Sequence, residues 1–68
     1  MKDSEALDFL AGKLNGKAAA ADALGATPQQ FTNWYARGIS ANKRPAVWAM
    51  VNDHGGNLSR DWLMARAA

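Results

Sequence analysis

The segment from residue 28 to residue 37 carries uncharged polar side chains that fall on one side of a helix. Gln29 and Asn33 are four residues apart, Thr32 lies between them, and Pro28 precedes them on the same side. A carboxamide can donate and accept hydrogen bonds at once, which matches the major-groove edge of adenine, and threonine can contact thymine. The candidate base-reading residues are therefore Pro28, Gln29, Thr32 and Asn33.

Apolar residues alternate with these polar ones at helical spacing. Phe31, Trp34 and Tyr35 stand at positions i, i+3 and i+4, the pattern of a helix with one apolar side. We expect Phe31 and Trp34 to be buried in the core. Their burial would turn the polar residues outward.

Basic and hydroxyl side chains flank the same segment. Such groups, together with helix N-termini, commonly contact DNA phosphates and so position a protein without specifying sequence. The first 16 residues hold two lysines against three acids, so the net charge of +2 arises from the rest of the chain. The candidate phosphate-binding residues are Lys17, Thr27, Arg37, Lys43 and Arg44.

The residues that would support other chemistry are sparse. The chain has no cysteine, and its single histidine, His54, follows Asp53 at an expected helix end, where it more often caps carbonyls than binds a metal. The acidic residues are scattered without the pairing that acid-base catalysis requires. We therefore expect neither an enzyme nor a metal or cofactor site.

Five short helices are expected to position these residues. Start and stop signals place them at about 4–14, 17–24, 28–37 and 45–53, with a last one after Ser59. Thr27 and Pro28 form a strong start signal, because threonine caps exposed amides and proline needs no partner at the first helical position. No segment alternates with the period of a strand, so the predicted fold is all-α in one 68-residue domain.

The second and third of these helices have the spacing of a helix-turn-helix. They are joined by a short turn containing Gly25, and small Ala21 lies four residues before that glycine, where the two helices would cross. Phe31 and Trp34 follow the glycine by six and nine residues. The motif therefore spans about residues 17–38.

The segment KAAAADALGATPQQFTNWYARG resembles the helix-turn-helix of phage Cro repressors and of related Cro-like and YdaS-like proteins. The later segment NLSRDWLMAR resembles the end of compact helical repressor domains of the Xre type. Trp34 stands where a smaller aliphatic residue is usual, and Pro28 where some Cro proteins have glutamine. The resemblance implies a five-helix repressor-like fold, with residues 28–37 in the major groove and Lys17 and Thr27 against the DNA backbone.

The function that this implies is sequence-specific binding of double-stranded DNA by a transcriptional repressor of phage or prophage origin. Proteins of this resemblance usually occupy palindromic operators as homodimers. We expect no ligand-sensing domain and no small-molecule ligand. The alternative, which the YdaS-like resemblance also allows, is an antitoxin or adaptor that acts mainly through contacts with another protein.

Four further large side chains admit two interpretations: Tyr35, Trp48, Met50 and Trp62. They either complete a thin core or contribute to a dimer interface, for which the last two helices are the expected source. The longest apolar stretch is far shorter than the roughly 20 residues of a membrane span. We therefore expect a cytoplasmic protein of a bacterium or a phage-infected cell.

Overall fold

Residues 2–64 are described by the computed structural model, and all the regular elements within them are α-helices. The five helices are α1 (Asp3–Lys13), α2 (Lys17–Ala23), α3 (Pro28–Arg37), α4 (Arg44–Asp53) and α5 (Arg60–Met64). The all-α prediction is thus confirmed. The bounds of α3 agree with the predicted ones, and α5 begins directly after Ser59 as predicted. The predicted bounds of α1, α2 and α4 differ by a residue at one or both ends.

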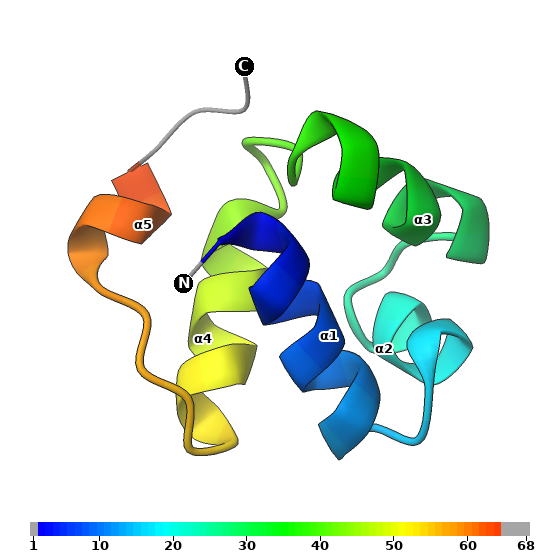
Figure 1. Cartoon of the computed structure of the whole chain (residues 1–68), viewed down its shortest axis with the longest axis horizontal. Coiled ribbons are helices and arrows are strands. Elements are labelled where there is room, and N and C mark those ends of the chain that lie inside the picture. Colours follow the sequence, from blue (N-terminus) through cyan, green and yellow to red (C-terminus); the bar gives the residue numbers. More distant parts are fainter. Residues whose placement is uncertain (1, 65–68) are drawn as a thin grey trace.

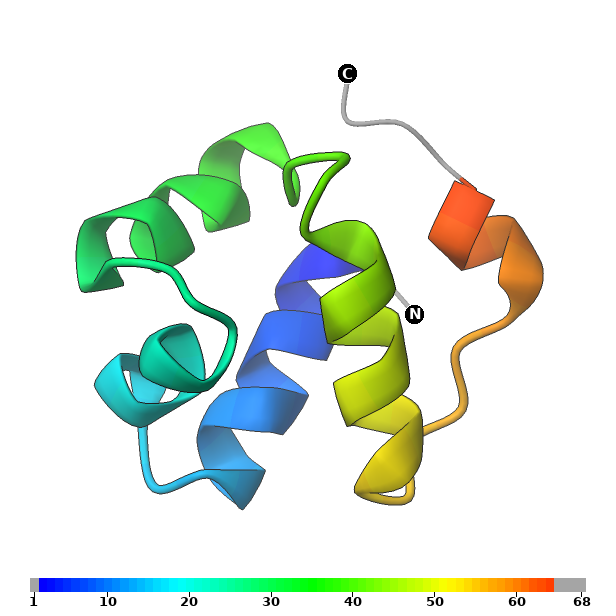
Figure 2. The same ribbon diagram turned by 180° about the vertical axis from the view of Figure 1, so that it is seen from behind.

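The helices are arranged around α1. α4 lies beside it on one side, α2 and α3 pack against it on the other, and α5 contacts α4 at the outer edge (Figures 1 and 2). The largest fully buried side chains come from α1, α3, α4 and the loop between α3 and α4: Leu7, Leu10, Phe31, Ile39, Val47 and Val51. One continuous apolar core therefore supports α3 from behind.

Small side chains allow α2 to lie close to its neighbours. Ala20 and Ala21 are fully buried, although each contributes only a methyl group. A four-residue turn, Leu24 to Thr27, then leads into α3, and Gly25 in this turn has φ of +69°. Glycine has no Cβ and takes up this conformation at little cost, so Gly25 stands at the position where the turn requires a positive φ.

The start of α3 is fixed by a reciprocal capping box. Thr27 Oγ1 accepts a hydrogen bond from the Gln30 amide at 3.1 Å, and Gln30 Oε1 accepts one from the Thr27 amide at 2.9 Å. Pro28 occupies the first helical position, where its missing N–H costs nothing. The helix ends at Gly38, whose φ is +88°.

The large side chains for which two interpretations were open pack in or against the core. Trp62 is 8% exposed, while Tyr35, Trp48 and Met50 are partly buried and pack against the core. Trp48 Nε1 donates to the carbonyl oxygens of Leu58 and Ser59, which holds the loop between α4 and α5. No helix among residues 2–64 combines the length and apolar composition needed to cross a membrane.

Candidate nucleic-acid interface

The outward side of α3 is a surface that we call the polar face. It consists of the four predicted base-reading residues, all of which are exposed and line one shallow hollow: Pro28, Gln29, Thr32 and Asn33. None of the four carries a charge. The structure thus brings together the four residues that the sequence predicted to act together.

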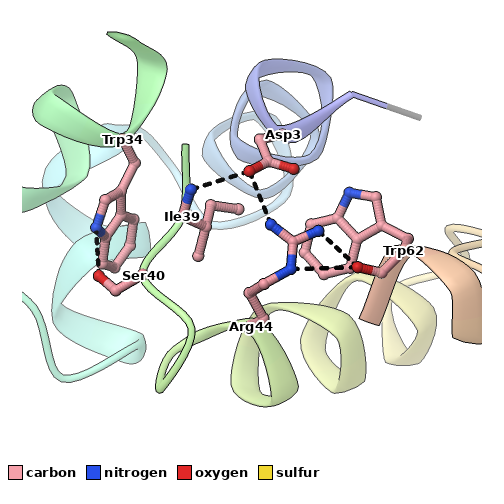
Figure 3. A network of polar contacts seen from close by, with 6 residues as sticks. All are labelled: Asp3, Trp34, Ile39, Ser40, Arg44 and Trp62. Atoms are coloured by element: carbon pink, nitrogen blue, oxygen red, sulfur yellow. Dashed lines mark hydrogen bonds and ion pairs between the residues drawn. The ribbon is translucent and has the colours of Figure 1, made fainter. Parts of the chain in front are cut away.

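Two aromatic anchors hold α3 from the opposite side. Phe31 is fully buried and Trp34 is 6% exposed, as the apolar spacing predicted. Trp34 also donates from Nε1 to Ser40 Oγ at 3.0 Å, which satisfies the indole N–H beside the core (Figure 3). The direction of the polar face is therefore set by packing on the inner side of the same helix.

The polar side chains of α3 differ in how freely they can bind a partner. Thr32 Oγ1 donates to the Pro28 carbonyl at 3.0 Å, and the Gln30 carboxamide oxygen is engaged in the capping box. Within residues 2–64, neither the Gln29 nor the Asn33 side chain makes a hydrogen bond. These two carboxamides are the groups of the polar face that are open to an external donor and acceptor.

Lys17, Thr27 and Arg37 are exposed around the polar face. Lys17 opens α2, and its Nζ lies 4.7 Å from the centre of the Tyr35 ring. Thr27 precedes α3 and Arg37 is its last residue. The three exposed side chains thus stand at the start of α2 and at the two ends of α3.

Tyr35 connects this edge of α3 to α1. Its hydroxyl donates to Asp8 Oδ1 at 2.7 Å. Burial, this hydrogen bond and the nearby negative charge of Asp8 together raise the pKa of Tyr35 to about 12. The phenol is therefore neutral and fixed as a donor at any physiological pH.

Lys43 makes contacts that the sequence did not predict. Its Nζ donates to the carbonyl oxygens of Leu24 at 2.9 Å and Gly25 at 3.4 Å, which are the free carbonyls at the end of α2. The ammonium thus ties the start of α4 to the turn before α3. We leave Lys43 out of the phosphate-binding set, since its contacts support the turn itself.

Arg44, which the sequence predicted to bind phosphate, is instead buried and only 3% exposed. Its guanidinium forms an ion pair with Asp3 Oδ2 at 2.8 Å and donates twice to the Trp62 carbonyl, at 3.2 and 2.6 Å. It also lies 4.0 Å from the centre of the Trp62 ring (Figure 3). A phosphate has no access to a guanidinium that is enclosed in this way.

The acid that pairs with Arg44 was missed by the sequence reasoning. Asp3 Oδ2 accepts hydrogen bonds from both Arg44 and the Ile39 amide, and so joins α1 to the loop that follows α3. A carboxylate in the first turn of a helix is ordinarily explained by the helix dipole alone, so its position does not signal a distant partner. The pairing spans 41 positions, and no local pattern signals it.

Among residues 2–64, no three His, Cys, Asp or Glu side chains gather in a way that could hold a metal ion. Comparisons with protein-family models, with curated proteins and with solved structures find no match for the chain. The function proposed below therefore follows from the geometry of α3 and of the residues around it.

Proposed function

We propose that this protein binds double-stranded DNA sequence-specifically, with α3 in the major groove, and acts as a Cro-like repressor in the cytoplasm of a bacterium or phage-infected cell. One observation carries the proposal. The helix that follows a four-residue turn is anchored by buried Phe31 and Trp34 and presents an uncharged, amide-rich face to solvent. A preformed row of side chains on a rigid helix is what reading base edges requires.

Base recognition would depend on Gln29 and Asn33. Each carboxamide offers one donor and one acceptor, and a bidentate pair with adenine discriminates against the wrong base by about 1–3 kcal/mol. Neither group would have to break a hydrogen bond within residues 2–64 to make such a pair. The polar face is therefore ready for binding without rearrangement.

Backbone contacts would come from the exposed groups beside the polar face. Lys17 and Arg37 supply positive charge, and the Thr27 hydroxyl can donate to a phosphate while its oxygen still caps α3. Release of condensed counterions would make the affinity fall steeply with salt. The buried Arg44 has no part in this set.

A second copy of the chain is part of the proposal. α3 has ten residues and is about 15 Å long, so one copy spans only about four base pairs. So short a site recurs often in any genome, and a dimer on two half-sites one helical turn apart raises the specificity. Repression would then result from occupying an operator, without a small-molecule ligand.

Selection from random double-stranded oligonucleotides at low salt tests the proposal. We expect an enriched motif with two related half-sites, and we expect the Gln29→Ala/Asn33→Ala double variant to lose sequence preference while it keeps its helical circular dichroism. Asn57→Ala is the matched control, because Asn57 is an exposed amide on the loop between α4 and α5, and this loop runs on the side of the molecule away from α3 (Figure 1). Absence of any enriched motif for the folded protein would rule out the repressor function and favour the adaptor alternative.

A further inference from the structure

The middle of the proposed DNA-binding surface contains no cation. The polar face holds two carboxamides, one threonine and one proline, and the next outward residue along α3 is the exposed Ala36. Arg37 is the only charged residue of α3 and stands at its C-terminal end. Whatever base pairs lie beneath the middle of α3 would therefore meet amide, hydroxyl and methyl groups.

Guanine is a poor partner for such a surface. In the major groove it displays two acceptors, N7 and O6, and its usual partner is arginine or lysine with two donors. A carboxamide has its donor and acceptor side by side, so against guanine its oxygen would face another acceptor. Adenine, with one acceptor and one donor, satisfies both groups of Gln29 or Asn33.

The internal hydrogen bond of Thr32 further limits which bases this side chain can contact. Its hydroxyl proton is already given to the Pro28 carbonyl at 3.0 Å, so Thr32 cannot donate to guanine or to thymine O4 without losing that bond. What Thr32 retains for a partner is a methyl group and an oxygen lone pair. The methyl group matches the C5-methyl of thymine, the one apolar group on the major-groove edges.

The neighbouring polar residues do not restore the missing donors. The Gln30 carboxamide oxygen and the Thr27 hydroxyl oxygen are engaged in the capping box, which holds both side chains at the start of α3, beside the polar face and not within it. Lys43 and Arg44 are committed to Leu24, Gly25, Asp3 and Trp62. The nearby basic residues that remain available, Lys17 and Arg37, stand at the edges of the polar face.

We infer that the polar face selects a run of about three or four A·T pairs, with adenines opposite Gln29 and Asn33 and a thymine methyl against Thr32. Any G·C preference is confined to the flank beside Arg37. The inference rests on the proposed DNA binding and adds the class of sequence that is bound.

Deep sequencing of the selected oligonucleotides gives the first test. The expected result is a half-site with an A·T core and with any conserved G·C pair at its edge. An enriched motif with a conserved G·C core would overturn the A·T inference and leave DNA binding intact. A folded protein that enriches no motif would overturn the DNA-binding proposal, and the inference with it.

Replacing single thymines by uracil in the selected half-site tests the Thr32 contact at the level of one methyl group. We expect one position at which the replacement weakens binding about three- to fourfold, the value of one buried methyl. Thr32→Val keeps a methyl and should keep this sensitivity, whereas Thr32→Ser retains the hydroxyl and should lose it. Equal sensitivity of wild type and Thr32→Ser at every position would overturn the assignment of Thr32.

A gain of function provides an independent check on the carboxamide assignment. Gln29→Arg replaces a donor-acceptor pair by two donors, so one A·T position of the selected motif should become G·C, while the remaining core positions stay unchanged. Asn57→Arg is the matched control, because Asn57 is an exposed carboxamide on the loop between α4 and α5 and its replacement should leave the core bases as they were. A motif unchanged by Gln29→Arg would overturn the role of Gln29.

Discussion

Arg44 illustrates, at the scale of single residues, how a charge can be used to hold a small fold together. It is nearly enclosed, its partner Asp3 is 23% exposed, and the two are joined by a direct ion pair. A buried pair of this kind adds little by itself, but the removal of one partner leaves the other charge without compensation. The same Asp3 oxygen also satisfies the Ile39 amide.

We therefore expect Asp3→Ala to lower the free energy of unfolding by about 2–4 kcal/mol, since it leaves the buried Arg44 guanidinium without its countercharge and the Ile39 amide without its acceptor. Urea denaturation measures this loss. Asp22→Ala is the control, because Asp22 is exposed on α2 and its removal should change stability by less than about 0.5 kcal/mol. Equal effects of the two substitutions would contradict the role given to Asp3.

Tyr35 allows a second measurement on one side chain, because it is the only tyrosine in the chain. Its ultraviolet titration should show a pKa of about 12, raised by burial and by the contact with Asp8, against the ordinary value of 10.0. The folded state holds the phenol proton more tightly than the unfolded state, so this contribution to stability is complete below pH 10 and is lost as the pH rises toward 12.

Asp8→Asn is the matched change for this titration. It removes the negative charge and keeps a group of the same shape, so the pKa of Tyr35 should fall toward 10 while burial keeps part of the shift. A titration at the ordinary value in the wild-type protein would show that the hydroxyl is open to water and not bound to Asp8.

At the scale of elements, the turn between α2 and α3 receives support from a third helix. Lys43 stands immediately before α4 and donates to carbonyls at the end of α2. Cations at a helix C-terminus stabilise it through the last carbonyls and the helix dipole. The orientation of α3 therefore depends on α4 as well as on its own anchors.

Lys43 and Lys17 should consequently behave differently in DNA-binding experiments. Lys43→Met should lower stability by about 0.5–1 kcal/mol and leave the dependence of log affinity on log salt unchanged, since no phosphate contact is lost. Lys17→Gln should leave stability nearly unchanged and reduce that slope by about 0.9. A reduced slope for Lys43→Met would instead show that Lys43 contacts the DNA backbone.

The local elements could be predicted well from the sequence, and the long-range contacts could not. Thr27, Pro28 and Gly38 mark the ends of α3 by backbone conformation, which depends on neighbours only, so its bounds were predicted correctly. The place of Arg44 depends on Asp3, which is distant in sequence. A lysine followed by an arginine at the start of a helix is typical of a solvated surface. No neighbouring residue indicates that Arg44, and not Lys43, is the buried one of the two.

At the scale of the whole molecule, α5 contacts few other elements of the fold. It packs against α4, and Trp62 is its one buried residue. Through the Trp62 carbonyl and ring, this short helix covers the Arg44 guanidinium. The stability of the outer edge of the fold therefore depends mainly on one side chain.

Trp62→Ala should destabilise the protein by about 3–5 kcal/mol, a large part of the stability of so small a domain. Met64→Ala on the same helix is the control, because Met64 is 76% exposed and should change stability by less than about 0.5 kcal/mol. Thermal unfolding followed by circular dichroism compares the two. Similar midpoints for both variants would show that α5 contributes little to the fold.

The two sides of α3 have separate tasks, and this separation has a consequence for how such a protein can change over generations. The anchors Phe31 and Trp34 maintain the fold, while Gln29 and Asn33 support nothing else within residues 2–64. Substitutions at these two exposed positions are nearly free of folding cost. Under the proposed function, descendants of one scaffold could acquire new operator preferences by single codon changes, and two prophages in one host could diverge until neither repressor acts on the other's operator.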